Sequence, residues 1–573
     1  MKEKIQEQII KALKTLNIEE NNFSVEHPTD FKNGDYSTNV AMVCAKQLKT
    51  NPRDLADKIK IELEKDLIKE ISKVEVAGAG FINFYLSREF FTESVSVILN
   101  EKDNWGKNNL LSGKKVMVEY TDPNPFKPFH IGHLMANAIG ESISRIVEFS
   151  GAKTIRANYQ GDVGPHVAKA IYGILNSKEY SEVGLSNING SVSEVANWIG
   201  KCYSEGSNFY DTDENIKKEI EIINKAVYDK SDDKINKIYE WGRSITLEAF
   251  EEIYKLLGTK FEYYFFESDM AKIGEKIVKE NVPNVFTESD GAIVFHGEEY
   301  DKKLHTRVFI NSQGLPTYET KEIGLTITKF EKENPDISII TTAIEQAEYM
   351  KVVQKSISIM HPDLESRMKH ITHGMMKLST GKMSSRKGNI ITGESLLHDS
   401  MDIVLEKMKD REISEEEKKR ISEIVGVSAL KYSILRSSLG SDIIYDFEKS
   451  ISFDGDSGPY LQYTSVRANS ILKKAENINT NGKNEIPENI TELEKILYKF
   501  PEVVIYSYNE LQPHQIATYL IELASAFNTF YGNTQILVEE NKYMSYHLNL
   551  IKAFNQTMKN GLWLLGIEIP ERM

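Results

Sequence analysis

Cysteine is scarce in this sequence, which has only Cys44 and Cys202 among its 573 residues. Two thiols so far apart along the chain indicate neither a disulfide framework nor a zinc–thiolate cluster, which favours a reducing compartment. Long hydrophobic runs are lacking too, since a bilayer span needs about 20 consecutive apolar residues, whereas runs such as 562–565 are far shorter. We therefore expect a cytoplasmic protein with no membrane span and no tightly bound structural metal.

An excess of positive charge is also lacking. The chain has 70 Lys and Arg against 85 Asp and Glu, a net charge of −15, whereas nucleic-acid binding requires clustered basic residues. Net charge is a sum over the whole chain, however, and a local basic groove is compatible with it. With 40% hydrophobic and 27% charged residues, the composition is that of an ordinary globular protein. The partner has to be inferred from motifs.

Periodicity divides the chain into three predicted domains. Residues 1–105 combine helical patterns with a strand-like run, which predicts a small α+β domain. Residues 106–445 open with a strand pattern at 115–120 (KVMVEY), a helical pattern, and a second strand pattern at 154–159. This order is the βαβ unit of a doubly wound sheet. Residues 446–573 carry long helical patterns and predict an all-α domain, so the expected class is α/β with a Rossmann-type central domain.

The central domain is predicted to contain a helical insertion at about 167–260, where the sequence is charged and shows no strong strand. Strand-like pieces resume after it, and we expect them to continue the same sheet at 261–266, 292–296, 307–311 and 337–342. From about residue 422 onward we expect no further strands. Helices are predicted there at 458–477, 492–511, 514–531 and 544–565.

The segment 119–134 (EYTDPNPFKPFHIGHL) places His130, Gly132 and His133 where the first strand ends and a helix begins. Ligands of doubly wound sheets bind at this edge, and phosphates favour the free N–H groups of a helix start. Gly132 would let a purine approach the backbone, while the imidazoles could donate to phosphate oxygens as charge develops. Two simpler interpretations stay open, a chance helix cap and a zinc pair, although no third ligand lies nearby in the sequence.

The segment 377–389 (KLSTGKMSSRKGN) is rich in Gly, Ser and Lys. Such a loop can fold over a polyphosphate and neutralise it, as the departure of pyrophosphate requires. The alternative interpretation is a solvated basic turn.

Together, the two segments resemble the HIGH and KMSKS signatures of class I aminoacyl-tRNA synthetases. The first, with Asn124 and Lys127 before its first histidine, resembles the arginyl branch of that family. The segment 33–42 (NGDYSTNVAM) resembles the N-terminal tRNA-contacting domain of the arginyl enzymes. Further matches to them lie at 156–164 (RANYQGDVG), 317–324 (TYETKEIG), 429–435 (ALKYSIL), 458–467 (GPYLQYTSVR) and 570–573 (PERM).

The resemblance implies an enzyme that activates arginine with ATP and Mg²⁺ and transfers it to the 3′ end of tRNA(Arg). It further implies a monomer, an N-terminal tRNA-contacting domain at 1–105, a catalytic domain at 106–445 and an anticodon-binding domain at 446–573. The catalytic residues it implies are Lys127, His130, His133 and Lys382. The ATP-binding residues are His130, Gly132, His133, Lys382, Met383, Ser384 and Ser385.

Arginine would be chosen through its guanidinium, whose planar fork of five donors matches a carboxylate. The resemblance implies arginine contacts from Glu119, Asn124, His130, Tyr318, Glu322 and Gln346, with Tyr318 and Glu322 at the guanidinium. Because lysine cannot form the same fork, and wrong amino acids would leave a buried carboxylate unpaired, no editing domain is needed. Each of these residues also has an ordinary structural interpretation, such as a strand end or a core tyrosine.

Two departures from the family pattern matter. Ser385 stands where the usual loop signature has its second lysine, and Lys127 is then thought to supply the missing charge. Glu322 stands where the family typically has aspartate, so its carboxylate lies one methylene further out.

The helical C-terminal region is expected to bind the tRNA. Tyr460, Gln462, Tyr463 and Arg467 offer rings for unpaired bases and a guanidinium for phosphates or base edges. Packing tyrosines with a surface arginine are an equally good interpretation.

Three other functions fit parts of the pattern. One is another class I synthetase, although a cysteinyl enzyme needs a zinc–thiolate site. The second is a metallohydrolase that uses His130, His133, His370 and His373. The third is a tRNA-binding module with an inactive site, against which the intact His130, His133 and Lys382 argue.

Overall fold

The computed structural model describes residues 1–379, 392–476, 478 and 484–573. The chain forms two compact units. The first comprises Met1–Trp105, Arg467–Pro501 and Glu522–Asn560, and the second comprises Gly106–Val466, Glu502–Ile521 and Gly561–Met573.

The first unit contains the small α+β fold that the sequence predicts. Its strands form an antiparallel sheet in the order β1-β2-β4-β3, where β1 is Val25–Glu26, β2 Tyr36–Thr38, β3 Ile71–Ala77 and β4 Phe81–Leu86. Ile5 and Ile9, one helical turn apart, share a buried core with Phe84 of the sheet. The helices of this part are α1 Lys2–Thr15, α2 Val40–Leu48, α3 Pro52–Glu64 and α4 Arg88–Glu101.

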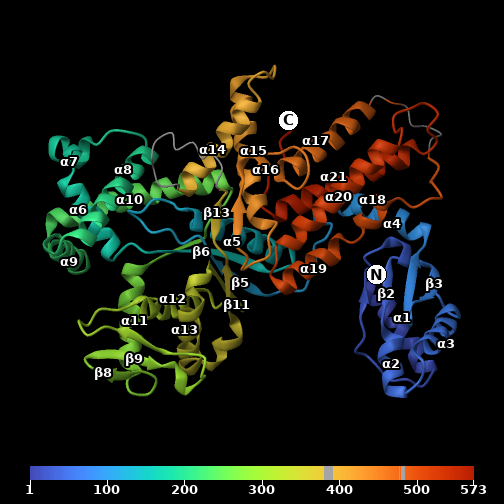
Figure 1. The fold of residues 1–573 in the computed structure, drawn as a ribbon, viewed down its shortest axis with the longest axis horizontal. Coiled ribbons are helices and arrows are strands. Elements are labelled where there is room, and N and C mark those ends of the chain that lie inside the picture. The colour runs from blue at the N-terminus through green and yellow to red at the C-terminus, as the bar shows by residue number, and fades with distance from the viewer. Residues whose placement is uncertain (380–391, 477, 479–483) are drawn as a thin grey trace. The chain divides into compact units, whose positions relative to one another are not determined.

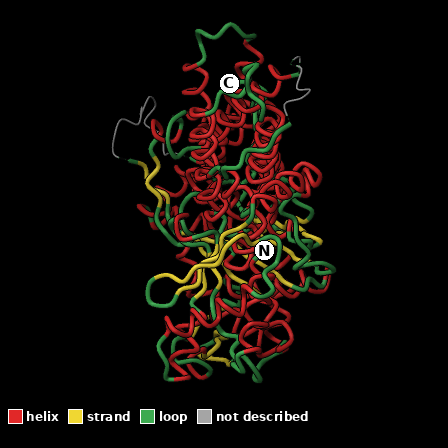
Figure 2. The backbone as a smooth tube through the Cα atoms, turned by 90° about the vertical axis from the view of Figure 1, so that its right-hand side faces the viewer, coloured by secondary structure: helices red, strands yellow, loops and turns green. Residues whose placement is uncertain are grey.

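The second unit is built on a parallel sheet, whose strands are drawn in yellow in Figure 2. Its strands are β5 Lys115–Glu119, β6 Lys153–Gln160, β7 Tyr263–Phe266, β11 Ile337–Ala343 and β12 Met368–His373, in the order β12-β11-β5-β6-β7. The chain therefore adds strands to one side of β5 and later to the other. In doubly wound sheets, ligands bind where the strand order reverses, beyond the carboxyl ends of the strands. Here that point is the end of β5, at Glu119.

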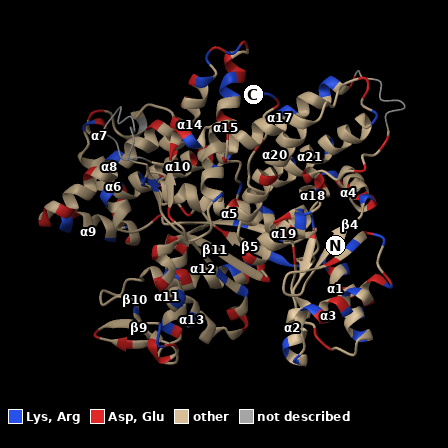
Figure 3. Ribbon diagram, turned by 45° about the vertical axis from the view of Figure 1, so that its right-hand side comes forward, with Lys and Arg blue, Asp and Glu red and all other residues tan. Residues whose placement is uncertain are grey.

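Helix α5, Ile131–Phe149, packs across β5, β6 and β11 (Figure 1). On this unit lie also α11, Glu267–Glu280, and α12, Tyr318–Glu333, which pack against each other. Between β6 and β7 the chain forms helices and no strand, as expected for the insertion. These helices are α6 Pro165–Asn176, α7 Lys178–Val183, α8 Val192–Thr212, α9 Glu214–Asp229 and α10 Asp233–Leu257. Acidic and basic residues are interspersed on outer helices such as α9 (Figure 3).

Two strand predictions need correction. The pieces at 292–296 and 307–311 are strands, but with β8 (Thr287–Ser289) they form a separate antiparallel sheet, as β9 (Ala292–His296) and β10 (Thr306–Ile310). A strand pattern does not specify which sheet a strand joins. A strand also occurs beyond residue 422, because β14 (Ile443–Tyr445) pairs with β13 (Met376–Leu378). Three residues are too few for a periodic signal.

The C-terminal part is helical, as predicted, with α17 Gly458–Ala475, α18 Glu492–Leu497, α19 Phe500–Glu510, α20 His514–Asn533 and α21 Met544–Leu564. The single helix expected at 492–511 is instead two. Pro501 is the second residue of α19, where its missing N–H costs no helical hydrogen bond. The remaining helices are α13 Ala347–Met360, α14 Gly393–Lys407, α15 Glu415–Leu435 and α16 Phe447–Ser450.

Helices α11 and α12 approach each other closely at two glycines. A Cβ on Gly324 would lie 2.2 Å from the Met270 carbonyl oxygen, and one on Gly274 would lie 1.9 Å from that of Thr320. Gly324→Ala should therefore force the two backbones apart and destabilise the protein by about 1–3 kcal/mol, the usual effect of overpacking. Urea-induced unfolding measures this change.

Gly532→Ala is the matched control, because a Cβ on this α20 residue meets nothing within 4 Å. It should leave the free energy of unfolding unchanged or raise it by up to about 1 kcal/mol, since alanine is the better helix former. Equal stability of the two variants would contradict the close packing of α11 on α12.

Candidate active site

The N-terminus of α5 is capped by its own two histidines. The backbone N–H of His130 donates to Nδ1 of His133 at 3.2 Å, and the N–H of His133 donates to Nδ1 of His130 at 3.3 Å. The rings are stacked with their centroids 3.4 Å apart. A Cβ on Gly132 would lie 3.0 Å from Cε1 of His130, so glycine is what leaves room beside that ring. The side chains that cap the helix are thus the same ones that we expect to bind phosphate.

Both imidazoles are neutral donors at neutral pH. Burial, followed by the nearby Lys127, lowers the pKa of His130 to about 4, and burial with the neighbouring His130 ring holds the pKa of His133 well below its usual value. Because each Nδ1 accepts a backbone N–H, the ring proton of each neutral imidazole is on Nε2. Each ring can thus present an N–H to an anion without carrying charge.

Lys127 is half-buried in the loop before α5. Its Nζ lies 5.4 Å from the centroid of the Tyr203 ring. Burial lowers the pKa of its ammonium group, an effect that Glu267 opposes and Lys169 reinforces. A cation therefore lies close to the two imidazoles.

The loop between β5 and α5 has unusual backbone geometry. Thr121, Asp122 and Phe126 have φ angles of 82°, 48° and 68°. Residues other than glycine rarely adopt this backbone conformation. Asn137 Nδ2 donates to Thr121 Oγ1 at 3.0 Å, and the N–H of Tyr159 donates to Asp122 Oδ1 at 2.7 Å. Such conformations persist only where the surroundings enforce them, and they cluster at ligand sites.

Buried carboxylates gather at the end of β5. Glu119 accepts from Lys329 Nζ at 2.8 Å, and both side chains are almost fully buried. Glu322, from α12, is also buried, and its Oε2 has no hydrogen-bond partner among the described residues. Burial and then the charge of Glu119 raise the pKa of Glu322 to about 8, and the same two causes raise the pKa of Asp122 well above its usual value. The arrangement suits a cation that brings several N–H donors.

A fourth acid lies beside these groups. Glu267, at the start of α11, accepts from Lys321 Nζ at 2.7 Å, and both side chains are buried. The same Lys321 Nζ is 5.0 Å from the centroid of the Tyr318 ring, which is largely exposed. A Cβ on Gly161 would lie 2.2 Å from Asn124 Oδ1 and 3.1 Å from Glu267 Oε1, so the Asn124 side chain lies close to Glu267.

The other predicted residues are more scattered. Gln346 is exposed just before α13, and its Oε1 accepts from the Tyr349 hydroxyl at 3.5 Å. Lys382, Met383, Ser384 and Ser385 lie outside the described residues.

The four residues predicted to bind tRNA lie on α17 and differ in exposure. Tyr463 is 37% exposed, whereas Gln462 is fully buried and donates to the Glu568 carbonyl oxygen at 2.6 Å. Arg467 donates to Asn528 Oδ1 at 2.8 Å, and Tyr460 is partly buried.

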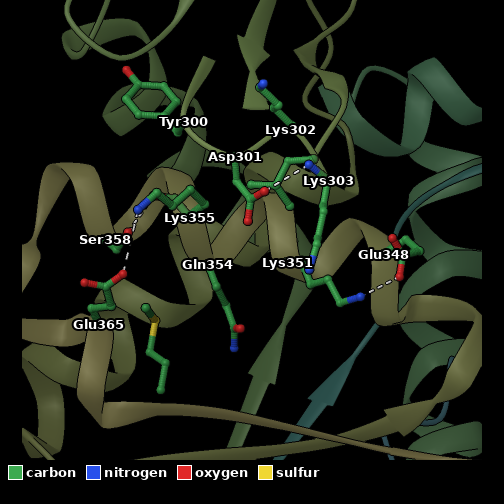
Figure 4. Close-up of a pocket in the computed structure, with 12 residues that line it drawn as sticks. Tyr300, Asp301, Lys302, Lys303, Glu348, Lys351, Gln354, Lys355, Ser358 and Glu365 are labelled. Atoms are coloured by element: carbon green, nitrogen blue, oxygen red, sulfur yellow. Dashed lines mark hydrogen bonds and ion pairs between the residues drawn. The ribbon is translucent and has the colours of Figure 1, made fainter. Parts of the chain in front are cut away.

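A cavity of about 1040 Å³ lies along α13 (Figure 4). None of the predicted site residues that the structure describes lines it. Lys351 pairs with Glu348 at 2.6 Å and Lys355 with Glu365 at 3.7 Å, so the charges of these lysines are balanced locally.

Three family models together match nearly the whole chain. That of class I (R) tRNA synthetases, catalytic domain, matches residues 94–447, the arginyl-tRNA synthetase N-terminal domain matches 2–86, and the DALR anticodon-binding domain matches 461–573. The chain belongs to the arginyl-tRNA synthetase family.

Relatives of known sequence and structure agree with this membership. The arginine–tRNA ligase of Clostridium perfringens is 31% identical over 562 residues, covering 96% of each chain, and that of Fusobacterium nucleatum is 33% identical over 557 residues, covering 94% of this chain and 93% of its own. The solved arginyl-tRNA synthetase of Thermus thermophilus has a TM-score of 0.81 at 23% identity, with full coverage of both chains. This last likeness shows a shared fold.

The sequence patterns do not identify three residues of the site, which are Asp122, Glu267 and Lys329. Asp122 has the appearance of a turn residue, and Lys329 that of a helix-surface lysine. Glu267 follows a strand pattern, which was the one available signal.

The four histidines of the metallohydrolase alternative are engaged in other contacts. His370 Nε2 lies 2.7 Å from Thr342 Oγ1, His373 Nδ1 lies 2.8 Å from the Gly374 carbonyl oxygen, and His130 and His133 cap α5. Among the described residues, no group of three or more His, Cys, Asp and Glu side chains could hold a metal ion. Nor does any helix in that part of the chain have the length and apolar character to cross a membrane.

Glu322→Gln should raise the KM for arginine about 10- to 100-fold and leave the KM for ATP nearly unchanged, because hydrogen bonds to a charged group contribute about 1.5–3 kcal/mol. Since the pKa of Glu322 is raised to about 8, arginine has to displace a proton from it at lower pH. The wild-type KM for arginine should therefore fall as pH rises from 6 to 9, and the variant should lose this dependence. Steady-state aminoacylation across that range provides both measurements.

Glu319→Gln is the control, because Glu319 lies on the same helix and is also buried, but accepts from Arg307 at 3.1 Å. Its KM for arginine should stay near the wild-type value. Equal losses toward arginine and ATP in Glu322→Gln would instead indicate a structural role for Glu322.

Proposed function

We propose that this chain joins arginine to the 3′ end of tRNA(Arg) by way of an arginyl-adenylate. The observation that carries the proposal is the proximity of two features at the end of β5. One is the helix start with two neutral imidazole donors, and the other is the group of buried carboxylates around Glu322. The first suits a phosphate chain and the second suits a guanidinium, and the two lie at the two ends of one short loop.

In the first step, a carboxylate oxygen of arginine attacks the α-phosphorus of ATP, and pyrophosphate leaves. His130 and His133 donate from Nε2 to phosphate oxygens, where negative charge builds up in the transition state. Lys127 and Lys382 supply positive charge, and Gly132, Met383, Ser384 and Ser385 complete the contacts to ATP. We expect Mg²⁺ to be bound mainly through the phosphates of ATP, since this ion keeps several of its waters and few protein ligands.

Arginine is held by its two polar ends. Glu322 and Tyr318 contact the guanidinium, and Glu119, Asn124, Gln346 and His130 contact the remaining polar groups. The Oε2 of Glu322 has no hydrogen-bond partner among the described residues. This supports the assignment, because a buried acceptor without a donor is costly and a guanidinium supplies one.

In the second step, a hydroxyl of the terminal ribose attacks the carbonyl carbon of the adenylate, and AMP leaves. We assign residues 1–105 and 446–573 to tRNA contacts and 106–445 to catalysis. Tyr460, Tyr463 and Arg467 would reach the RNA, with the exposed Tyr463 in direct contact. The buried Gln462 would hold the helix in place through its hydrogen bond to the Glu568 carbonyl oxygen. The protein would act as a monomer in the cytoplasm.

Pyrophosphate exchange with each of the twenty amino acids, with and without intact tRNA(Arg), tests the function. Only arginine should support exchange, and only when tRNA is present, as the family resemblance implies. Coupling between linked sites is typically about 1–3 kcal/mol, and here it would arise if tRNA binds better to the closed site. Exchange with a different amino acid would refute the function. Robust exchange without tRNA would refute only the coupling.

Lys127→Ala should slow adenylate formation about 10²- to 10³-fold, the usual effect of losing one oriented donor to transition-state charge. The reason is that Ser385 replaces the lysine that the loop signature normally supplies. Ser385→Lys in the Lys127→Ala background should restore part of the rate, whereas the same change in the wild type should have little effect. Near-normal exchange by Lys127→Ala would show that the compensation does not exist.

A further inference from the structure

Helix α5 holds more than the phosphate-binding histidines. Its middle contacts the arginine-binding loop, and its later half binds the main-chain oxygens of Trp563 and Leu564, at the end of α21. Helix α5 and the segment 563–566 both belong to the second unit. A network of largely buried side chains connects the loop to this segment.

At the loop end, the network begins with Tyr120. This residue lies between Glu119 and the strained Thr121, so its position determines theirs. Its ring packs so tightly on α5 that a Cβ on Gly140 would lie 2.2 Å from it. The Tyr120 hydroxyl donates to Glu141 Oε2, and both side chains are buried.

Glu141 joins the loop to two arginines. It accepts from Arg145 Nε at 2.7 Å and from Arg156 Nε at 3.1 Å. Burial would raise the pKa of its carboxyl, but Arg145 and Arg156 outweigh that effect and hold the pKa below its usual value. The group is therefore ionised, and its three donors fix it in one place. Such fully bonded buried groups specify a single arrangement.

At the other end, three side chains converge on Gly566. A Cβ on this residue, whose φ is +66°, would lie 3.0 Å from Lys431 Nζ and 3.8 Å from atoms of both Arg145 and Glu141. Lys431 is buried and donates to the carbonyl oxygens of Gly566 at 2.7 Å and Leu257 at 2.6 Å.

The same segment is also held by α5 directly. Arg145 donates to the Trp563 carbonyl oxygen at 3.0 Å, and Ser142 Oγ donates to that of Leu564 at 2.8 Å. Carbonyls at a helix end lack partners within the helix and favour cations, so these contacts hold the segment firmly.

We propose that Tyr120, Glu141 and Lys431 are positioning residues of one network, through which the segment 563–566 fixes the arginine-binding loop and sets the affinity for arginine. None of the three needs to touch the substrate. The effect would be selective, because the ATP-binding histidines are held by their own mutual cap and not by this network. The inference rests on the proposed function of the loop.

The test uses the full chain and two changes at opposite ends of the network, Tyr120→Phe and Lys431→Met, alone and combined. Each single change should raise the KM for arginine in aminoacylation by about tenfold, as expected for losing a buried hydrogen bond to a charged group, with the KM for ATP within about twofold. Tyr120 binds Glu141 directly, and Lys431 holds the segment 563–566, which Arg145 joins to Glu141. Because both changes break one connected path, the double variant should be little worse than either single one. If Lys431→Met does not fold, Lys431→Gln takes its place, because its shorter side chain cannot reach both carbonyl oxygens that Lys431 binds.

Tyr432→Phe is the matched control, since Tyr432 is a buried tyrosine next to Lys431 whose hydroxyl donates to a different carboxylate, Asp456. It should lower the melting temperature about as much as Tyr120→Phe does and leave the KM for arginine unchanged. Independent, multiplying effects of the two network changes would overturn the proposal, as would equal rises in the KM for arginine and for ATP. A wild-type protein that fails to charge tRNA(Arg) would instead refute the proposed function.

Discussion

The site depends on the burial of carboxylates at the point where the strand order of the parallel sheet reverses. Glu119 and Glu322 are buried there, with the partly buried Asp122 nearby, and the one ion pair of these three in the described residues is that of Glu119 with Lys329. Burial, and then repulsion from the charge of Glu119, raises the pKa values of Glu322 and Asp122. A guanidinium relieves this repulsion and supplies several donors in one plane. In the proposed function, arginine is selected because its guanidinium offsets the cost of burying these carboxylates together.

Helix α5 joins the two halves of the chemistry. Its first turn presents the imidazoles of His130 and His133. Further along the helix, Asn137 and Glu141 bind Thr121 and Tyr120, the two residues that precede Asp122. Since one rigid helix carries both sets of contacts, it can align the attacking carboxylate of arginine with the α-phosphate of ATP. Alignment of this kind removes much of the entropic part of a barrier.

Much of this could be predicted from the sequence. The buried run KVMVEY, the helix after it and the next strand were enough to place the sheet and the edge where ligands bind. Residues of the histidine motif were identifiable because their spacing is local. Lys329 was not, since a lysine on a helix is usually solvated, and only the fold shows that this one is buried against Glu119. Asp122 could not be identified either, since an aspartate in a turn is usually solvated. The network around Glu141 could not be predicted because it joins residues hundreds of positions apart.

The two separate errors about strands have a related cause. The patterns at 292–296 and 307–311 predict strands, which β9 and β10 confirm, but pairing partners are a property of the three-dimensional fold. Here β9 pairs with β10 on one side and with β8 on the other. For β14, three residues carry no period at all.

Calorimetry of arginine binding in the presence of tRNA tests whether a buried, largely protonated carboxylate selects arginine. Titrations at pH 7 in buffers of different ionisation enthalpy report the protons exchanged with the solvent. We expect release of about one proton per arginine bound, because the pKa of Glu322, raised to about 8, favours the protonated form, which has to ionise to pair with the guanidinium. Arginine binding with an enthalpy independent of the buffer would contradict it.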